Sequence, residues 1–223
     1  LTVTEKQIKM LSVQEKNNKI FSGDVDTYKT NQLRGGEGYL IQRYFEGRVL
    51  ILGCGAGRIF KHLLDKGFDI TGIDINSDMV NAAKIAYPSV PVLVMDAVDL
   101  KFPDETFDTI YFPFHGIDYV HPDIYLAVNE AKRVLKPNGI FIFSSHNRFF
   151  LKKLHRFFDG NYSDYHGLIT YRTTFIDFFR LKKRFKSVKM IQMISISQTG
   201  NWKDSVYKIF PFFSKSTYFV CKK

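Results

Sequence analysis

Apolar residues along this chain follow two alternating patterns. Short apolar runs bounded by glycine or proline are typical of strands buried on both faces of a parallel sheet. Longer segments in which apolar residues recur every three or four positions are typical of amphipathic helices. The patterns predict strands over 49–52, 69–74, 91–95, 107–112 and 140–144, and helices from Glu37 and over 57–66, 78–86 and 122–135. This alternation predicts an α/β domain with a parallel sheet and right-handed crossovers.

The alternation stops after position 146. Residues 147–173 are aromatic and basic without a clean period, which indicates a lid or an insertion. The remaining predicted elements are a helix over 175–183 capped by Thr174, a strand from Val188 to Ser197 and a strand from Ser216 to Cys221. We therefore expect residues 147–215 to contain a variable insertion on the side of the sheet where a ligand would bind.

The segment before the first strand is polar and less regular. Residues 4–20 mix a few apolar residues with lysines and glutamates, which indicates a polar helix lying over the domain or a partly mobile arm. A break at Gly35 and Gly36 precedes the helix that starts near Glu37, and the segment before that helix is a candidate cover for a ligand. We expect residues 1–46 to form a helical arm or cap and residues 47–223 to form the main domain.

The first strand ends in a turn with glycines at alternate positions, Gly53, Gly55 and Gly57. Because glycine has no Cβ atom, these residues can adopt positive φ and let a ligand lie against backbone N–H groups near a helix N-terminus. A dinucleotide-binding turn needs a glycine at position 58, where this chain has Arg58, so NAD is disfavoured. A tight turn that serves packing alone would use the same residues.

Charge is distributed unevenly along the chain. Residues 1–146 carry 16 Lys and Arg against 18 Asp and Glu, a net −2, whereas residues 147–223 carry 16 against 4, a net +12. The basic part favours a phosphate-bearing acceptor, an anionic lipid headgroup or nucleic acid, and a solvated basic surface is the equal alternative. Two cysteines exclude a disulfide framework and a cysteine-ligated metal, which favours a reducing, cytoplasmic setting. The sequence contains no apolar stretch of membrane-spanning length and no secretory signal in its first 20 residues.

Residues 52–58 resemble the L-G-C-G-x-G-R signature of class I S-adenosylmethionine (SAM) dependent methyltransferases. Three later stretches resemble further landmarks of that family: Gly72–Asn76, with an acid at the end of the second strand; Met95–Asp108, similar to D-A-x-D-L-P-F-P-D-x-S-F-D; and Ala131–Ile140, similar to R-V-L-K-P-G-G. The resemblance covers roughly residues 45–146. It implies a doubly wound, mostly parallel seven-stranded sheet with helices on both faces and an antiparallel C-terminal strand.

The resemblance also implies cofactor roles. The residues are Gly53, Cys54, Gly55 and Gly57 for the methionine part of SAM, Asp74 for the ribose, Ile75 and Met79 for the walls around adenine, and Asp96 and Ala97 for the adenine amino group and a ring nitrogen. A carboxylate suits the ribose because only an acceptor with two oxygens can take both hydroxyl donors at once. The alternative for Asp74 is a cap of the following helix, for which Asn76 and Ser77 are also candidates.

Position 51 departs from the family pattern. Ile51 stands where the family usually has an Asp or Glu that helps to hold the SAM ammonium. Backbone carbonyls near Gly53 or Phe112 would have to take over this role. Arg58 and Arg34 are candidate partners for the SAM carboxylate, and a surface position is the alternative for both.

Methyl transfer requires alignment of the acceptor with the S–CH₃ bond, and it requires a base only where the acceptor atom must lose a proton early. In this family the acceptor site lies beyond the fourth and fifth strands, where this chain has His115, His121 and His146. Because imidazole titrates near pH 7, His115 is the first candidate base and His146 the second. Packing, hydrogen bonding or substrate orientation is the alternative role for each, and no metal site is predicted.

The sequence therefore predicts a SAM-dependent methyltransferase acting on O or N of a small-molecule acceptor, and the basic C-terminal part favours an anionic or phosphorylated one. One alternative is a nucleic-acid methyltransferase that uses the basic and aromatic residues of 147–189, although no Asn-Pro-Pro-Tyr-like run is present. A second is a methyltransferase-like domain that binds a partner without catalysis, which Ile51 alone supports. The sequence leaves open the acceptor, the atom that is methylated and the oligomeric state.

Overall fold

The computed structural model describes residues 15–23, 25, 29–34, 36–121, 123–146, 162–165, 168–171, 175–192 and 216–223. Residues 15–23 are helical, and the helices that follow are α3 (Glu37–Tyr44), α4 (Phe60–Leu64), α5 (Ser77–Ala86), the short 3-10 helix η1 (Gly116–Tyr119), α6 (Ile124–Val134) and α7 (Phe175–Lys182). The strands are β1 (Arg48–Leu52), β2 (Asp69–Asp74), β3 (Val92–Val94), β4 (Phe107–Phe112), β5 (Leu135–His146), β6 (Tyr162–Tyr165), β7 (Leu168–Tyr171), β8 (Ser187–Gln192) and β9 (Ser216–Lys222).

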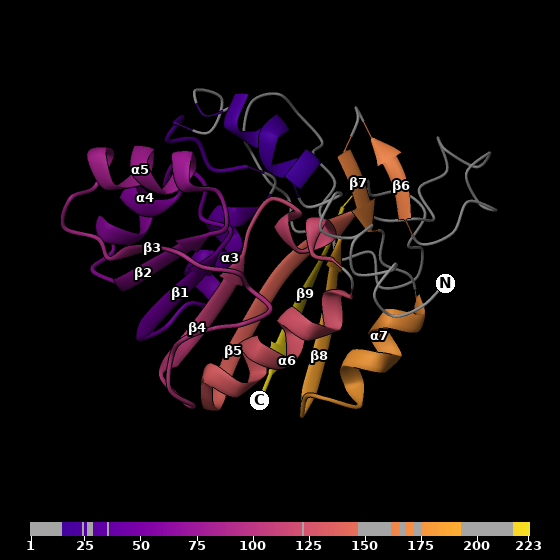
Figure 1. The fold of residues 1–223 in the computed structure, drawn as a ribbon. Coiled ribbons are helices and arrows are strands. Elements are labelled where there is room, and N and C mark those ends of the chain that lie inside the picture. The colour runs from indigo at the N-terminus through magenta and orange to yellow at the C-terminus, as the bar shows by residue number, and fades with distance from the viewer. Residues whose placement is uncertain are drawn as a thin grey trace.

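Seven of the strands form one sheet in the order β3-β2-β1-β4-β5-β9-β8 (Figure 1). Neighbours from β3 to β5 pair in parallel, whereas β9 runs antiparallel to both β5 and β8. Strands β6 and β7 pair with each other in a separate antiparallel ladder. The architecture confirms the predicted doubly wound, mostly parallel sheet with an antiparallel C-terminal strand.

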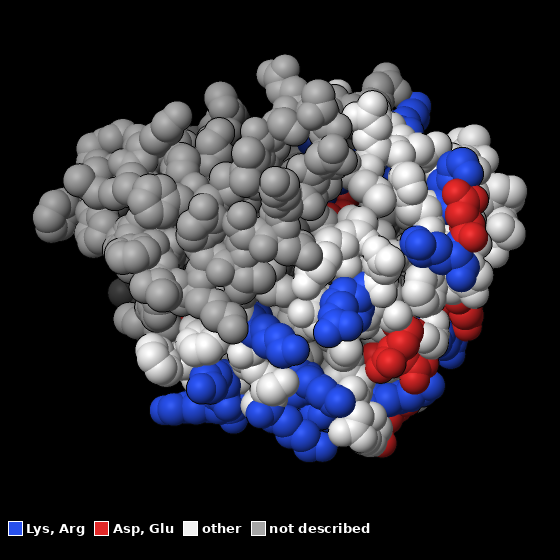
Figure 2. Space-filling model, turned by 180° about the vertical axis from the view of Figure 1, so that it is seen from behind, with Lys and Arg blue, Asp and Glu red and all other residues white. Residues whose placement is uncertain are grey.

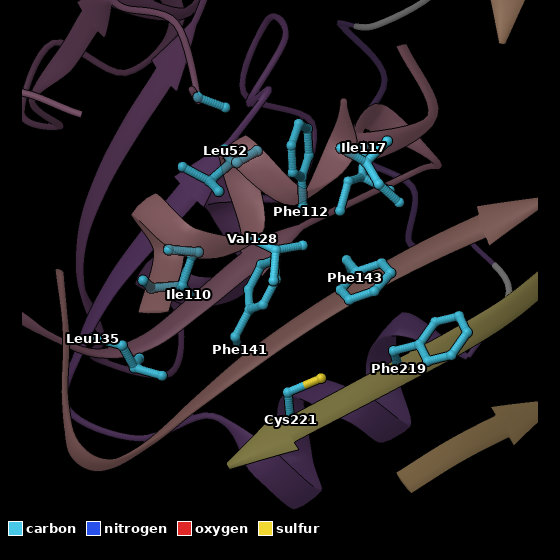
Figure 3. Packing of buried hydrophobic residues seen from close by; sticks show 14 of the residues in the cluster. Leu52, Ile110, Phe112, Ile117, Val128, Leu135, Phe141, Phe143, Phe219 and Cys221 are labelled. Atoms are coloured by element: carbon cyan, nitrogen blue, oxygen red, sulfur yellow. The ribbon is translucent and has the colours of Figure 1, made fainter. Parts of the chain in front are cut away.

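Alternate residues of β1 face two hydrophobic clusters, one on each side of the sheet. Val49 and Ile51 belong to the cluster that contains buried residues of α3, α4 and α5. Leu50 and Leu52 belong to the cluster that contains residues of α6 and α7, where Phe141, Phe143 and Phe219 pack as Figure 3 shows. Burial on both faces explains why this strand is a continuous apolar run rather than an alternating one.

Three elements begin two or more residues away from their predicted starts. The helix predicted from position 57 begins at Phe60, because Gly55 and Gly57 have φ of 54° and 83° and continue the turn. The helix predicted from position 122 begins at Ile124, because the Asp123 side chain caps it by accepting a bond from the Tyr125 N–H. Strand β5 begins before the predicted position 140, and its register with β4 shifts where Asn138 has φ of 65°.

The C-terminal predictions are tested in part. Helix α7 agrees with the predicted helix over 175–183, and β9 agrees with the predicted strand from Ser216. Strand β8 confirms the first part of the strand predicted from Val188, and its predicted continuation to Ser197 lies outside the described residues, as do Thr174 and residues 147–161. The boundary at residue 46 stays a prediction. In the part of the chain that the structure describes, no helix has the length and apolar character needed to cross a membrane.

Candidate active site

The carboxyl ends of β1, β2 and β4 and the loops after them border a pocket. It lies where the strand order reverses, between β1 and β4, which is where open α/β sheets bind ligands. Its lining includes every predicted cofactor residue except Gly57, namely Gly53, Cys54, Gly55, Asp74, Ile75, Met79, Asp96, Ala97 and Phe112. The topology therefore brings together residues from four separate stretches of the sequence.

The glycine turn places its backbone against the pocket. Gly53 and Gly55 have φ of 60° and 54°, and the Cys54 N–H donates to the Ile73 carbonyl at 2.9 Å, which ties the turn to β2. A Cβ atom on Gly53 would lie 2.8 Å from the Phe112 ring, so a larger residue would not fit. Burial raises the pKa of the Cys54 thiol well above its ordinary value, so this cysteine stays protonated.

Gly57 packs against two aromatic rings, and its role at the cofactor stays a prediction. Among the described residues it does not line the pocket, and a Cβ atom there would lie 2.9 Å from both Phe60 and Tyr87. The aromatic rings of Phe60 and Tyr87 are in edge-to-face contact, with centroids 5.4 Å apart. Position 57 therefore requires a glycine, because its φ is positive and because a Cβ atom would clash with these rings.

Asp74 connects the second strand to the glycine turn. Its Oδ2 accepts the Gly55 N–H at 2.8 Å and its Oδ1 accepts the Asn76 N–H at 2.9 Å. Burial raises the pKa of Asp74, and the backbone N–H groups of Asn76, Gly55 and Ile75 oppose this effect by favouring the carboxylate. The cap of α5 is Asn76, whose Oδ1 accepts the N–H groups of Asp78 and Met79. The alternative role of Asp74 as the helix cap is therefore wrong.

Two apolar residues and one acid border the pocket beyond Asp74. Met79 is buried and Ile75 is partly exposed, so they present an apolar surface at the start of α5. Asp96 follows β3, and its Oδ1 accepts the Val98 N–H at 3.1 Å. Together with the buried Ala97, these residues line one part of the pocket, and their role at adenine stays a prediction.

The helical residues 15–23 cover the pocket, which the sequence indicated only weakly. Asn17, Asn18 and Phe21 belong to its lining. The segment is held by Asn76, whose Nδ2 donates to the Asn18 carbonyl and to Ser22 Oγ, and Phe21 is in edge-to-face contact with Tyr119. Within the described residues, Asn18 Oδ1 is buried without a hydrogen-bond partner, so this polar lining atom fits a ligand that carries a hydrogen-bond donor.

Arg58 lies in the interior, so the surface position considered for it is wrong. Its side chain is 5% exposed, and it donates from both terminal nitrogens to the Glu37 carboxylate at 2.7 Å each. Tyr111, the register partner of Ile51, donates to the same carboxylate at 3.2 Å. On the face of the sheet that Ile51 and Tyr111 share with α3, a carboxylate is thus supplied by Glu37 and not by position 51. Arg58 neutralises the charge of this carboxylate. The sequence missed this pair because Glu37 and Arg58 belong to different predicted elements.

Of the three candidate histidines, one lines the pocket and the other two lie next to residues that line it. His121 lines the pocket, whereas His115 and His146 are not among the described lining residues. The lining does include Phe114 and Gly116 on either side of His115, and the rings of His115 and His146 are stacked with centroids 4.1 Å apart. His146 Nδ1 lies 2.7 Å from Asp118 Oδ2. The second candidate base is therefore paired with a carboxylate, and the first is stacked on it.

His115 gives the protein a specific pH dependence of stability. Burial, together with the nearby His146, lowers the pKa of His115 to about 3. Between that value and the unfolded value of about 6.5, the unfolded chain binds a proton that the folded chain does not, so stability increases with pH by at most about 1.4 kcal/mol per pH unit. We expect urea midpoints to fall on acidification through this window, and to fall less in His115→Gln. Equal pH dependence of the two proteins would contradict the assignment.

Comparisons with known proteins agree with this geometry. Residues 50–143 match the family model described as a methyltransferase domain. YqeM of Bacillus subtilis, which its name describes as a presumed methyltransferase, is 32% identical over 131 residues, covering 56% of this chain and 52% of its own. The ubiquinone/menaquinone biosynthesis C-methyltransferase UbiE of Rickettsia prowazekii is 35% identical over 128 residues, covering 51% of each chain. This chain thus spans about half the length of these curated relatives.

Solved structures share the fold over a longer stretch. A SAM-dependent methyltransferase of Thermotoga maritima has a TM-score of 0.61 at 20% identity and covers 99% of this chain and 96% of its own. A SAM-dependent methyltransferase of Archaeoglobus fulgidus has a TM-score of 0.61 at 17% identity, covering 84% and 91%. Residues 50–143 therefore match a methyltransferase domain, and the sheet order and the solved structures show the class I SAM-dependent methyltransferase fold, whose cofactor is S-adenosylmethionine.

Proposed function

We propose that the protein transfers a methyl group from SAM to O or N of a small-molecule acceptor. The observation that carries the proposal is the position of Asp74, whose two carboxylate oxygens lie at the pocket while bonded to the glycine turn and to Asn76. The pocket combines this carboxylate, a turn with glycine at positions 53 and 55, and an apolar wall at Met79, which together fit a nucleoside joined to an amino acid.

Each part of the pocket has a role in holding the cofactor. In the proposal, Asp74 binds the ribose, Asp96 and Ala97 bind adenine, and Gly53 and Gly55 bind the methionine part through their backbones. Asn18 Oδ1 supplies an additional acceptor from the covering helix. Bound SAM supplies an electrophilic methyl group on a sulfonium, so the protein has to align the acceptor and exclude water.

The acceptor side lies beyond β4 and β5, next to the sequence from position 147 onward. The basic C-terminal part supports an anionic acceptor only if its Lys and Arg side chains lie near the pocket. Lys182, Lys183 and Lys186 are exposed. Figure 2 shows Lys and Arg side chains gathered at one end of the side of the molecule that it draws. Ser187, which follows these lysines, is the register partner of Lys222, and Lys222 is also the register partner of Ile140 in the first half of β5. The three lysines therefore lie toward the amino end of β5, whereas the pocket lies at the carboxyl ends of the parallel strands. They give no support to an anionic acceptor, which rests on the cations of 147–173 and 200–215.

A carbon acceptor is a second candidate. UbiE of Rickettsia prowazekii is named as a C-methyltransferase, and a Synechocystis relative that is 36% identical over 104 residues is named 2-methyl-6-phytyl-1,4-hydroquinone methyltransferase. The second name describes an acceptor with ring hydroxyls, whose ionisation would activate either the oxygen or the ring carbon. The position of the new methyl group distinguishes the two candidates.

The purified protein, incubated with methyl-labelled SAM and a panel of phenols, hydroquinones and amines, tests the proposal. We expect S-adenosylhomocysteine to form together with a product labelled on oxygen or nitrogen, as read by mass spectrometry and NMR. A label on ring carbon would favour the second candidate. Absence of SAM binding in a folded sample would contradict the proposal and would favour a non-catalytic domain.

A further inference from the structure

A buried acceptor of the covering helix has no hydrogen bond. Asn18 lines the pocket, and its Oδ1 is buried without a partner in the part of the chain that the structure describes. A buried polar atom that makes no hydrogen bond is destabilising, and such atoms are rare in folded proteins. Because Asn18 belongs to the lining of a pocket, a ligand that donates a hydrogen bond would supply the missing partner.

The covering helix is attached on both sides of β1. On one side, Asn76 after β2 donates from Nδ2 to the Asn18 carbonyl at 3.0 Å and to Ser22 Oγ at 2.9 Å. On the other side, Phe21 contacts Tyr119, in η1 after β4, with ring centroids 5.1 Å apart. Since β1 lies between β2 and β4 in the sheet, a helix attached to both loops lies over the glycine turn in which β1 ends.

The side-chain amide of Asn18 is not what attaches the helix. The bond from Asn76 goes to the backbone carbonyl of Asn18, and Ser22 and Phe21 supply further contacts. The amide can therefore be replaced while these contacts remain, so a change in ligand binding can be separated from loss of the helix.

The donors of SAM differ in how many protons they offer. Each ribose hydroxyl carries one proton, and in the proposed function Asp74 accepts both. Asp96 after β3 is assigned to the amino group of adenine. The ammonium of the amino-acid part carries three N–H donors, and that part is assigned to the glycine turn, over which the covering helix lies. The ammonium is therefore the donor that fits an acceptor on this helix.

The surroundings of the glycine turn offer the ammonium no carboxylate of their own among the described residues. The acids in the described lining are Asp74 and Asp96, which have the roles given above. Position 51 in β1 is a buried isoleucine, and the Glu37 carboxylate on that face of the sheet is paired with Arg58. An uncharged acceptor from the covering helix would therefore contribute to holding the ammonium.

We propose that Asn18 Oδ1 accepts a hydrogen bond from the ammonium group of SAM. The inference rests on the proposed function and adds a residue that selects for the amine of the cofactor. Binding satisfies the buried acceptor and one N–H of the ammonium at the same time. The bond from Asn76 to the Asn18 carbonyl holds the amide in position over the turn.

Calorimetry with two ligands and the variant Asn18→Leu tests the inference. The ligands are S-adenosylhomocysteine, which has the same amino-acid end as SAM, and its analogue in which hydrogen replaces the amino group. Leucine keeps the branched shape of the side chain and removes the acceptor. We expect Asn18→Leu to bind S-adenosylhomocysteine about 10–100-fold more weakly than the wild type, the usual effect of a hydrogen bond to a charged group. We expect both proteins to bind the analogue equally well.

Asn18→Asp tests the charge of the bound group. A carboxylate attracts an ammonium and repels the carboxylate that both ligands carry, so the preference for S-adenosylhomocysteine over the analogue should exceed that of the wild type. Lys19→Ala is the matched control, because Lys19 is exposed on the same helix and does not line the pocket. We expect this control to bind both ligands with wild-type affinity.

The outcomes separate this inference from the proposed function. If Asn18→Leu weakens both ligands equally, the residue acts through packing of the helix, and the ammonium assignment is overturned. Unchanged affinity for S-adenosylhomocysteine, or a preference in Asn18→Asp no greater than in the wild type, overturns it as well. If the folded wild-type protein binds neither ligand, the proposed function fails together with the inference, whereas in the other cases cofactor binding stands.

Discussion

Asp74→Ala is expected to weaken SAM binding by at least about 100-fold in calorimetry. A hydrogen bond to a charged group contributes about 1.5–3 kcal/mol, and the carboxylate is proposed to accept two ribose hydroxyls. Because about 1.4 kcal/mol corresponds to a factor of ten, the loss of both bonds gives this magnitude or more. The variant also removes the acceptor of the Gly55 and Asn76 N–H groups, which loosens the turn that faces the ligand.

Asp78→Asn is the matched control for Asp74→Ala. Asp78 is an exposed acid in the first turn of α5, four residues after Asp74. Its replacement removes a negative charge near the pocket without removing a side chain that lines the pocket. We expect its SAM affinity to equal that of the wild type, and thermal melts of both variants establish that they are folded. If Asp74→Ala binds SAM as tightly as the control does, the ribose assignment is wrong.

Glu37→Ala is expected to lower the free energy of unfolding by about 3–5 kcal/mol, because it leaves the Arg58 guanidinium buried without its carboxylate. Arg58 is 5% exposed and Glu37 1%, so solvent cannot replace the lost partner. For a chain of this length, each kcal/mol corresponds to about 2–4 °C in the melting temperature, so scanning calorimetry should show a decrease of about 6–20 °C.

Two further variants test the cause of this decrease. Asp65→Ala breaks the exposed pair between Lys61 and Asp65, whose contact is 2.8 Å against 2.7 Å in the buried pair, and we expect little change in melting temperature because solvent screens the exposed pair. The double variant Glu37→Leu with Arg58→Met removes both charges and should recover most of the lost stability. A similar loss in Glu37→Ala and in the double variant would mean that packing, rather than an unpaired charge, causes the effect.

The sequence predicted those parts of the site that depend on local pattern. The glycines of the first turn, Asp74 after the second strand and Asp96 after the third each follow an apolar run, and parallel strands bring such ends to one edge of the sheet. The role of Gly57 stays a prediction, because glycine spacing alone does not distinguish ligand approach from the packing of Phe60 and Tyr87.

The parts that the sequence did not predict depend on contacts between distant segments. Asn18 and Phe21 belong to a polar helix with poor periodicity, and only its packing on Asn76 and Tyr119 identifies it as a cover. The sequence could not predict that His115 is buried or that His146 is paired with a carboxylate, because residue type gives no information on burial or on neighbouring side chains. Asp118 supplies that carboxylate from η1, 28 residues before His146.

A crystal structure of the protein soaked with S-adenosylhomocysteine tests the central claim most directly. We predict that the ribose hydroxyls lie within hydrogen-bond distance of both Asp74 oxygens, that adenine lies between Ile75, Met79 and Ala97, and that the amino-acid end lies along the Gly53 turn. A ligand bound elsewhere, or one whose sugar makes no contact with Asp74, would contradict the account.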